Sequence, residues 1–193
     1  INGASGNRPL VVLANLSGFD GSPESMRRLQ LEMGAEIGRA VVNFDGPIVF
    51  VVVGRYHGGA YAVFSKALNP QLRAFAIEGS FASVIGGAPA AAVVFPRDVI
   101  RRANADARVI ELEAEIENAP SAQKSSLRER LVVLKEEIML EKRGEVAEEF
   151  DTIHSVQRAV DVGSLDGVLK PSDLRPTIIR ELEAAFQIDA ISP

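Results

Sequence analysis

The chain has 193 residues, of which 47% are hydrophobic and 24% charged, and its formal net charge is −5. It contains no cysteine and two histidines, which excludes disulfides, thiol nucleophiles, cysteine-based zinc sites and a histidine-rich metal cluster, and we expect no bound metal. Its longest apolar runs, residues 48–53 and 88–95, are far shorter than the roughly 20 residues of a membrane span. With no basic stripe and no signal-peptide pattern, we expect a cytoplasmic protein with neither a membrane nor a nucleic-acid partner.

Residues 8–53 are predicted to form a strand, a helix and a second strand. Residues 8–15 are a short apolar run with β-branched side chains, typical of a buried strand. Ser22, Pro23 and an early acid form a helix-start signature, and this helix is expected to run to about Asn43. Residues 48–53 are almost wholly apolar, as expected for a parallel strand covered on both faces. The three elements together predict a right-handed βαβ unit.

The following segment repeats this pattern in a shorter form. Gly58-Gly59-Ala60 is expected to open a helix that runs to about Leu68, and short strands are expected at residues 74–77 and 81–85. A second glycine pair, at residues 86–87, then introduces another helix. Glycine is also needed wherever a strand turns sharply into a helix, so the two pairs alone indicate turns, with or without a bound ligand.

Beyond residue 98 the pattern changes to that of charged helices. Apolar residues recur at helical spacing on either side of Pro120, which predicts two helices folded into a hairpin with charged outer faces. This hairpin is expected to serve as scaffold or subunit contact. A final helix is predicted from about Pro171 to Phe186, after the loop of residues 162–167.

Reactive side chains in familiar arrangements are scarce. The chain has no G-x-G-x-x-G, no Walker A and no G-x-S-x-G sequence, so Ser17 is expected to be a turn residue. The lone His57 is more often a loop or capping residue than a catalyst. What remains is main-chain chemistry, because the amides of a glycine turn at the start of a helix can hold a developing anion. Gly58-Gly59-Ala60 is therefore a candidate oxyanion hole.

Three ordered motifs also resemble a known family. PLVVLANLSGFDGS at residues 9–22, RYHGGAYAV at 55–63 and SVIGGAPAAAVVF at 83–95 resemble the C-terminal half of the carboxyltransferase component of biotin-dependent acyl-CoA carboxylases, of the acetyl-CoA and propionyl-CoA carboxylase type. The resemblance implies an α/β, crotonase-like (ClpP/crotonase) fold, a superhelix of repeated β-β-α turns with an inserted helical hairpin. It places the carboxyltransferase core at residues 1–102, the hairpin insertion at 103–160, and the loop and helix that complete the core domain at 161–193.

The same resemblance implies a reaction and a site. The enzyme would move CO2 from carboxybiotin, held on a separate carrier domain, to the α-carbon of acetyl- or propionyl-CoA, giving malonyl- or methylmalonyl-CoA. The amides of Gly59 and Ala60 would hold the biotin oxyanion. The residues expected to surround the cofactor are Gly58, Gly18, Phe19, Gly21 and Tyr61. Those expected beside the acyl substrate are Ala62, His57 and Arg55.

The implied partners follow from the missing half of the site. They are the N-terminal carboxyltransferase half, the biotin carboxyl carrier domain and biotin carboxylase, in an ATP-dependent, homo-oligomeric complex of fatty acid biosynthesis. The chain would then be a fragment that needs its N-terminal half. Two positions depart from the family: His57 stands where single-chain acetyl-CoA enzymes have arginine, and Ala62 where propionyl-type enzymes often have aspartate.

Two other functions are compatible with the pattern. A crotonase-like CoA hydratase or isomerase would need a glutamate beside the glycine turn, and Glu78 is the only nearby candidate. A non-catalytic crotonase-like domain would use its hairpin for assembly alone.

Overall fold

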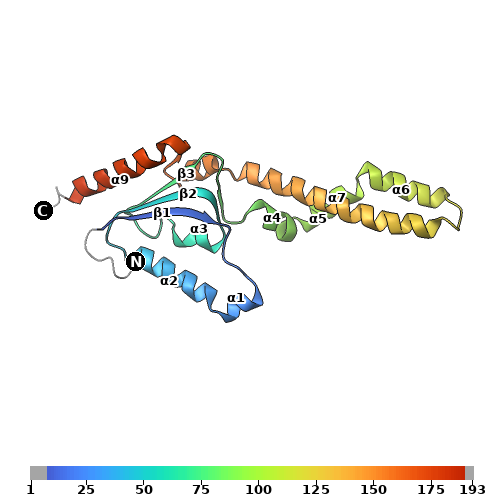
Figure 1. The fold of residues 1–193 in the computed structure, drawn as a ribbon, viewed down its shortest axis with the longest axis horizontal. Helices are drawn as coiled ribbons and strands as arrows, with labels where there is room; N and C mark the ends of the chain where they lie inside the picture. Colours follow the sequence, from blue (N-terminus) through green and yellow to red (C-terminus); the bar gives the residue numbers. More distant parts are fainter. Residues whose placement is uncertain (1–7, 190–193) are drawn as a thin grey trace. The chain divides into compact units, whose positions relative to one another are not determined.

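The computed structural model describes residues 8–189, with side chains to residue 186, and the chain divides into two compact units (Figure 1). Of the described residues, one unit contains 8–86 together with 153–189, and the other contains 87–152. Within the described part of the chain, no helix is long and apolar enough to cross a membrane.

A five-stranded sheet forms the centre of the first unit. Its strands are β1 (Leu10–Leu16), β2 (Ile48–His57), β3 (Leu72–Ile77), β4 (Phe81–Ser83) and β5 (Gly167–Leu169). The order is β1-β2-β3-β5, β4 also pairs with β2, and every pairing is parallel. The four predicted strands are confirmed with small shifts at their ends. β5 begins at Gly167, the last residue of the predicted loop, and was not foreseen.

β2 is the longest strand and the one that joins the others. Its first half is buried on both faces, with Ile48 to Val52 at most 1% exposed, as its apolar run predicted. This half pairs with β1 and β3, and the second half, from Arg55 to His57, pairs with β4. β2 therefore extends four residues beyond the predicted strand and ends directly at the Gly58 turn.

Helices cover the two faces of the sheet. On one face α2 (Gln30–Val42), α3 (Gly59–Val63) and α8 (Val156–Asp161) enclose the main hydrophobic cluster. Its aromatic centre is Phe50, whose ring lies 4.7 Å from Tyr56 and 4.9 Å from Phe64. On the other face α9 (Leu174–Asp189) packs Leu174, Ile178 and Leu182 against β2 and β3. A short 3-10 turn, Pro171–Asp173, leads into α9.

The prediction of one helix over residues 23–43 is wrong. The chain forms α1 (Pro23–Arg27) and then α2, and Leu29 between them has the left-handed φ of 58°. The predicted start is confirmed, because the Ser22 hydroxyl accepts a hydrogen bond from the Ser25 N–H. The helix opened by the first glycine pair is also shorter than expected, since α3 ends at Val63.

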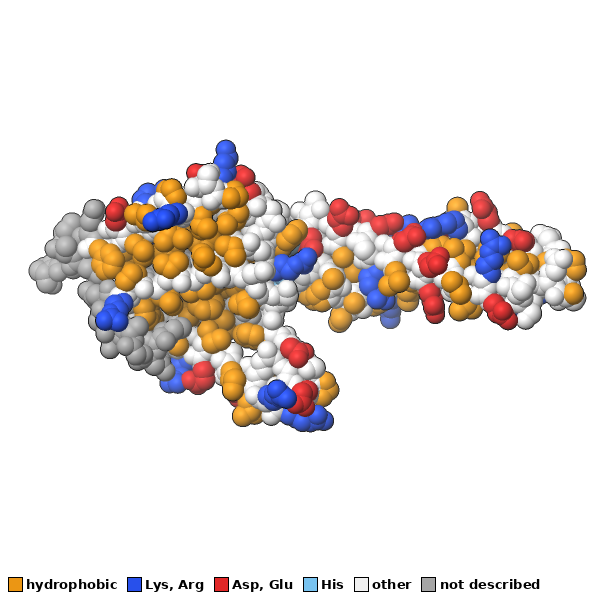
Figure 2. Space-filling view, viewed as in Figure 1, with side chains coloured by type: hydrophobic (Ala, Val, Ile, Leu, Met, Phe, Trp, Pro, Cys, Tyr) orange, Lys and Arg blue, Asp and Glu red, His pale blue; other side chains and the backbone are white. Residues whose placement is uncertain are grey.

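β1 leaves part of the second sheet face open. Val11 and Leu13 are the register partners of Val49 and Val51, so they lie on the face that α9 covers farther along the sheet. They are nevertheless 40% and 55% exposed. Figure 2 shows hydrophobic side chains gathered on this unit where Figure 1 places β1. An exposed apolar edge strand is a feature that folded proteins usually cover.

The second unit contains the predicted helical hairpin. It begins with α4 (Gly87–Pro89), a π-helical turn (Ala90–Val94) and α5 (Pro96–Asn104), and continues into α6 (Ala107–Asn118) and α7 (Lys124–Ile153). The hairpin encloses two small clusters. In one, Val99 packs with Ala91 and Val146, and in the other, Ile138 packs with Ala103 and Val109.

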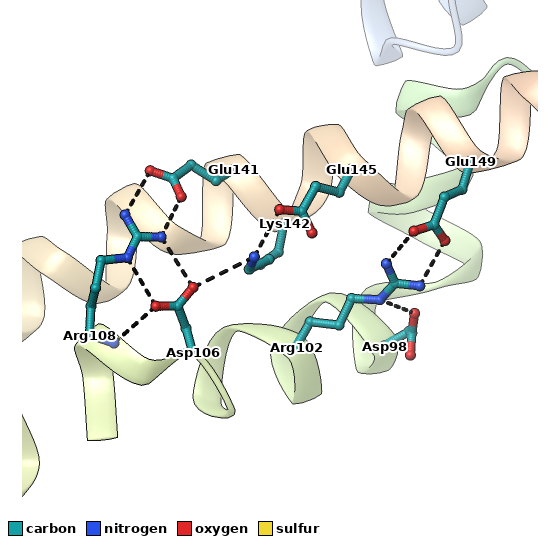
Figure 3. Close-up of polar contacts among 8 residues, drawn as sticks. All are labelled: Asp98, Arg102, Asp106, Arg108, Glu141, Lys142, Glu145 and Glu149. Atoms are coloured by element: carbon teal, nitrogen blue, oxygen red, sulfur yellow. Dashed lines mark hydrogen bonds and ion pairs between the residues drawn. The ribbon is translucent and has the colours of Figure 1, made fainter. Parts of the chain in front are cut away.

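Two ion-pair clusters link α7 to the helices before it (Figure 3). Arg102 lies 2.8 Å from Asp98 and 2.6 Å from Glu149. Arg108 bonds both Asp106 and Glu141, and its hydrogen bond is the main reason that the pKa of Asp106 falls to about 2.

Candidate active site

Two glycine turns touch at the ends of β1 and β2. Gly18 and Gly58 both have left-handed φ values, 111° and 64°. A Cβ added at Gly58 would lie 3.3 Å from the Gly18 Cα, and one added at Gly18 would lie 3.4 Å from the His57 carbonyl oxygen. The left-handed conformation therefore favours glycine at both positions, and at Gly58 the close approach of the Gly18 backbone adds to this preference. The structure thus brings together two of the predicted site residues from segments 40 positions apart.

The ring of Phe19 lies between two further glycines. A Cβ added at Gly59 would come within 2.6 Å of the Phe19 Cδ2, and one added at Gly34 of α2 within 2.6 Å of its Cε2. The ring therefore fills the space that side chains at both positions would need. Phe19 joins the β1 turn to the start of α3, which makes it a structural part of the predicted site.

The two predicted oxyanion donors differ in accessibility. Gly59 is exposed, whereas Ala60 has 0% exposed surface. The Gly58 N–H donates to Val84 O over 2.9 Å and the Tyr61 N–H to Gly58 O over 3.0 Å, while the Gly59 N–H has no acceptor among the described residues. Gly59 therefore belongs to the accessible surface of the turn, whereas the Ala60 amide would become accessible only if neighbouring groups moved.

His57 lies beneath the turn and not at its surface. Its side chain is 3% exposed, and Nδ1 lies 3.2 Å from the Ser83 Oγ. Because that hydroxyl donates its own proton to Ile85 O over 2.6 Å, we assign the Nδ1 proton to the bond from His57 to Ser83. His57 therefore ties the end of β2 to β4, and a substrate on the outer surface would not touch it.

The remaining predicted residues lie around this centre. The Arg55 guanidinium lies over the Phe81 ring, 5.5 Å from its centroid. Ala62 is exposed on α3, and Tyr61 is half-buried with its ring 5.3 Å from that of Tyr56. A Cβ at Gly21 would meet nothing within 4 Å, so this glycine is not part of the contact between the turns.

The sequence reasoning missed Asn15, which supports the same turn. Its Oδ1 accepts a hydrogen bond from the Arg55 N–H over 3.0 Å, and a Cβ at Gly54 would lie 2.5 Å from this oxygen. A polar residue at the end of one apolar strand and a glycine within the next were the signals that could have found this contact.

Acid–base and metal groups are sparse near the turn. Burial raises the pKa of Tyr56 well above its ordinary value, so this hydroxyl stays protonated and neutral. Among residues 8–189 no group of three or more His, Cys, Asp or Glu side chains is placed to hold a metal ion.

The sequence matches the carboxyl transferase domain over residues 4–191. The chain belongs to the carboxyl transferase domain family. Mitochondrial acetyl-CoA carboxylase of Saccharomyces cerevisiae is 34% identical over 65 residues, which is 33% of this chain and 3% of the yeast protein.

Solved structures of this family share the fold. Transcarboxylase 12S, crystallised as a hexamer with methylmalonyl-coenzyme A and methylmalonic acid bound, is 22% identical and superposes with a TM-score of 0.64. The beta subunit of P. aeruginosa geranyl-CoA carboxylase is 25% identical, with a TM-score of 0.63. These likenesses cover 94% and 95% of this chain but 28% and 30% of the relatives. The predicted crotonase-like fold with its helical hairpin is confirmed, and the chain spans less than a third of either solved relative.

The placement of Glu78 disfavours the hydratase or isomerase. Glu78 follows β3, is exposed, and donates its N–H to Leu169 O of β5 over 2.9 Å. None of its described contacts connects it to the Gly59 turn, where that chemistry would need a carboxylate.

Proposed function

We propose that this chain supplies the biotin-facing half of a carboxyltransferase site in a biotin-dependent acyl-CoA carboxylase. The enzyme would transfer CO2 from carboxybiotin to the α-carbon of an acyl-CoA such as acetyl- or propionyl-CoA. The observation on which this rests is the Gly59 amide, which belongs to an exposed residue and has no acceptor among the described residues, at a turn built from glycine and backed by Phe19. Membership of the carboxyl transferase family supports the class of reaction.

The turn fits a ligand oxygen that gains negative charge. Carboxybiotin, when bound, would supply the CO2 and afterwards the base that removes the α-proton of the substrate. The Gly59 N–H would donate a hydrogen bond to the anionic oxygen, and such a preorganised donor favours the transition state because it need not reorient. Gly18 and Gly58 leave this surface free of side chains, and Phe19 holds the Gly59 backbone in place. Ala60 would become the second donor once its covering neighbours move.

The open face of β1 supports the need for a second half. Val11 and Leu13 expose apolar surface at the edge of the sheet, which is unfavourable in water. We infer that an N-terminal carboxyltransferase half covers part of this chain and supplies the remaining contacts to acyl-CoA. A homo-oligomer, a biotin carrier domain, biotin carboxylase and a cytoplasmic location complete this proposal. The hexameric assembly and bound methylmalonyl-coenzyme A of transcarboxylase 12S are consistent with it.

The test removes a single N–H group. In the enzyme assembled with its complementary half, Gly59→Pro and Gly59→Ala both add a Cβ that meets Phe19, and only proline removes the donor. Proline is well tolerated at a first helical position. We expect Gly59→Pro to lower kcat for carboxyl transfer about 10²- to 10³-fold relative to Gly59→Ala, the loss typical of one oxyanion donor.

Both substitutions are best compared in a Phe19→Leu background, which removes the ring that the new Cβ meets. Circular dichroism of the two variants should agree, to exclude a folding difference. Equal kcat for the proline and alanine variants would refute the assignment of the Gly59 amide.

A further inference from the structure

A small pocket lies next to the Gly59 turn, within the same unit. Its volume is about 110 Å³. It is lined by Tyr61 of α3, by Ala82, Ser83 and Val84 of β4 and the turn after it, and by His154, Ser155, Arg158, Ala159 and Val162 of α8 and its flanks. Tyr61 is two residues after Gly59, and Val84 accepts the Gly58 N–H over 2.9 Å. The pocket and the turn therefore share one wall.

The pocket lining combines basic and apolar side chains and has no acidic ones. The wall includes an arginine and a histidine but no aspartate or glutamate, and two alanines and two valines make part of it apolar. The Arg158 main chain is fixed, because its N–H donates to the Ser155 Oγ over 3.3 Å. Arg158 is an exposed residue, and its guanidinium makes no ion pair within the described part of the chain. A cationic group of this kind beside an apolar hollow suits a small organic anion.

Two other basic residues near the turn, His57 and Arg55, have side chains that contact other groups. His57 is buried against Ser83, and the Arg55 guanidinium lies over Phe81. Arg158 is thus the arginine that the fold places beside the pocket at the Gly59 turn.

We propose that Arg158 binds the carboxylate of the carboxylated acyl group, with the apolar wall of the pocket beside its α-carbon. This inference rests on the proposed function, in which the product of the transfer is a thioester with a new carboxylate on that carbon. The planar guanidinium can bond both oxygens of a carboxylate at once. The pocket is too small for a whole acyl-CoA, and its size suits a carboxylate with a short substituent.

The probe is malonate, a dicarboxylate without coenzyme A, titrated into the isotopically labelled 193-residue chain at constant ionic strength. We expect saturable NMR shifts of the Arg158 Nε–H and of the Ser83 and Val84 amides. Arg158→Gln should weaken malonate binding about tenfold or more, since a charge-assisted bond is lost. Arg158→Lys should give an intermediate affinity, because it keeps the charge and loses the two-point geometry. The matched control is Arg175→Gln on α9, an exposed arginine, which should bind as the parent does.

Several outcomes would overturn the inference. One is that Arg158→Gln binds malonate with the same affinity as the parent. Another is that malonate shifts the NMR signals of Arg175 as much as those of Arg158. A third is that inorganic phosphate binds at the same amides more tightly than malonate, which would indicate a phosphate site. In the assembled enzyme, Arg158→Gln should raise the KM for the carboxylated acyl-CoA in the reverse reaction by at least the factor by which it weakens malonate binding. Malonate binding at Arg158 in an enzyme without carboxyl transfer would refute the proposed function and leave the pocket assignment standing. Transfer with an unchanged KM in Arg158→Gln would do the opposite.

Discussion

The contact between Phe19 and Gly59 gives a prediction whose sign depends on the structure. On backbone grounds alone, Gly59→Ala at the start of α3 should be neutral or stabilise by up to about 1 kcal/mol, because alanine favours helix. In this structure the added methyl would lie 2.6 Å from the Phe19 Cδ2 and 2.9 Å from Cε2. Carbon atoms in favourable contact are about 3.5–4.0 Å apart.

The ring already packs closely against α2, which limits how far it can move to relieve this overlap. A Cβ at Gly34 would lie 2.6 Å from the same ring, which shows how closely it already packs there. Overpacking of this kind costs about 1–3 kcal/mol. We therefore expect Gly59→Ala to lower the free energy of unfolding by that amount. In a Phe19→Leu background the same substitution should cost less than about 0.5 kcal/mol, so that the two sites couple by about 1 kcal/mol or more.

Tyrosine fluorescence during urea unfolding measures the stability of the structural unit that contains the Gly59 turn. The chain has two tyrosines and no tryptophan, and Tyr56 and Tyr61 both lie beside the turn. Gly21→Ala is the matched control in the same loop, because its Cβ would meet nothing within 4 Å, and it should change stability by less than about 0.5 kcal/mol. A stabilising Gly59→Ala, or an equal cost with and without the Phe19 ring, would refute the reasoning.

Two further predictions concern a charged and a buried polar contact. Lowering the pH from about 4 to 2 should destabilise residues 87–152. Hydrogen bonds from Arg108 depress the pKa of Asp106 from 3.8 to about 2. The stability that a carboxyl group with a depressed pKa contributes is lost as the pH falls through that folded-state pKa. Circular dichroism should show a smaller acid loss of helix in Asp106→Asn, and an unchanged pH profile would contradict this. Asn69 is 2% exposed, and its amide donates to Val41 O and Phe44 O over 2.7 and 2.9 Å. Asn69→Ala should therefore lower the free energy of unfolding in urea by about 2–4 kcal/mol. The exposed control Asn43→Ala should lower it by less than about 1 kcal/mol. Similar losses in the two variants would contradict the assigned role of the buried Asn69 amide.

Elements with a strong local signal could be predicted from the sequence. The apolar run of β2 and the Ser22 cap of α1 depend on neighbouring residues, and both were found. The break at Leu29 was not, because leucine has no preference for the left-handed region and the residues around it have normal helical periodicity. β5 is three residues long and is a strand only because β3 provides its hydrogen-bond partners.

In the candidate site, too, some residues could be predicted from local sequence and others depend on tertiary contacts. Gly18 and Gly58 could be predicted because turns of this conformation require glycine. Gly59 is glycine because its Cβ would meet the Phe19 ring, which is a tertiary contact. The burial of His57 and the position of Arg158 depend on contacts between β2, β4 and α8, which are separated by up to about a hundred residues in the sequence, and no local motif reports them. Such pairings are a property of the tertiary fold.

The length of β2 sets a restriction on how this chain can change in evolution. At roughly 3.3 Å per residue, its ten residues extend about 33 Å. One end of the strand pairs with β1 and β3, and the other end leads into the Gly58 turn. Removing or adding one residue within the strand would exchange the faces on which Tyr56 and His57 lie, so that the aromatic cluster and the bond to Ser83 would both be lost. Insertions and deletions among homologues are therefore expected in the connections between elements, and not between Ile48 and Gly58.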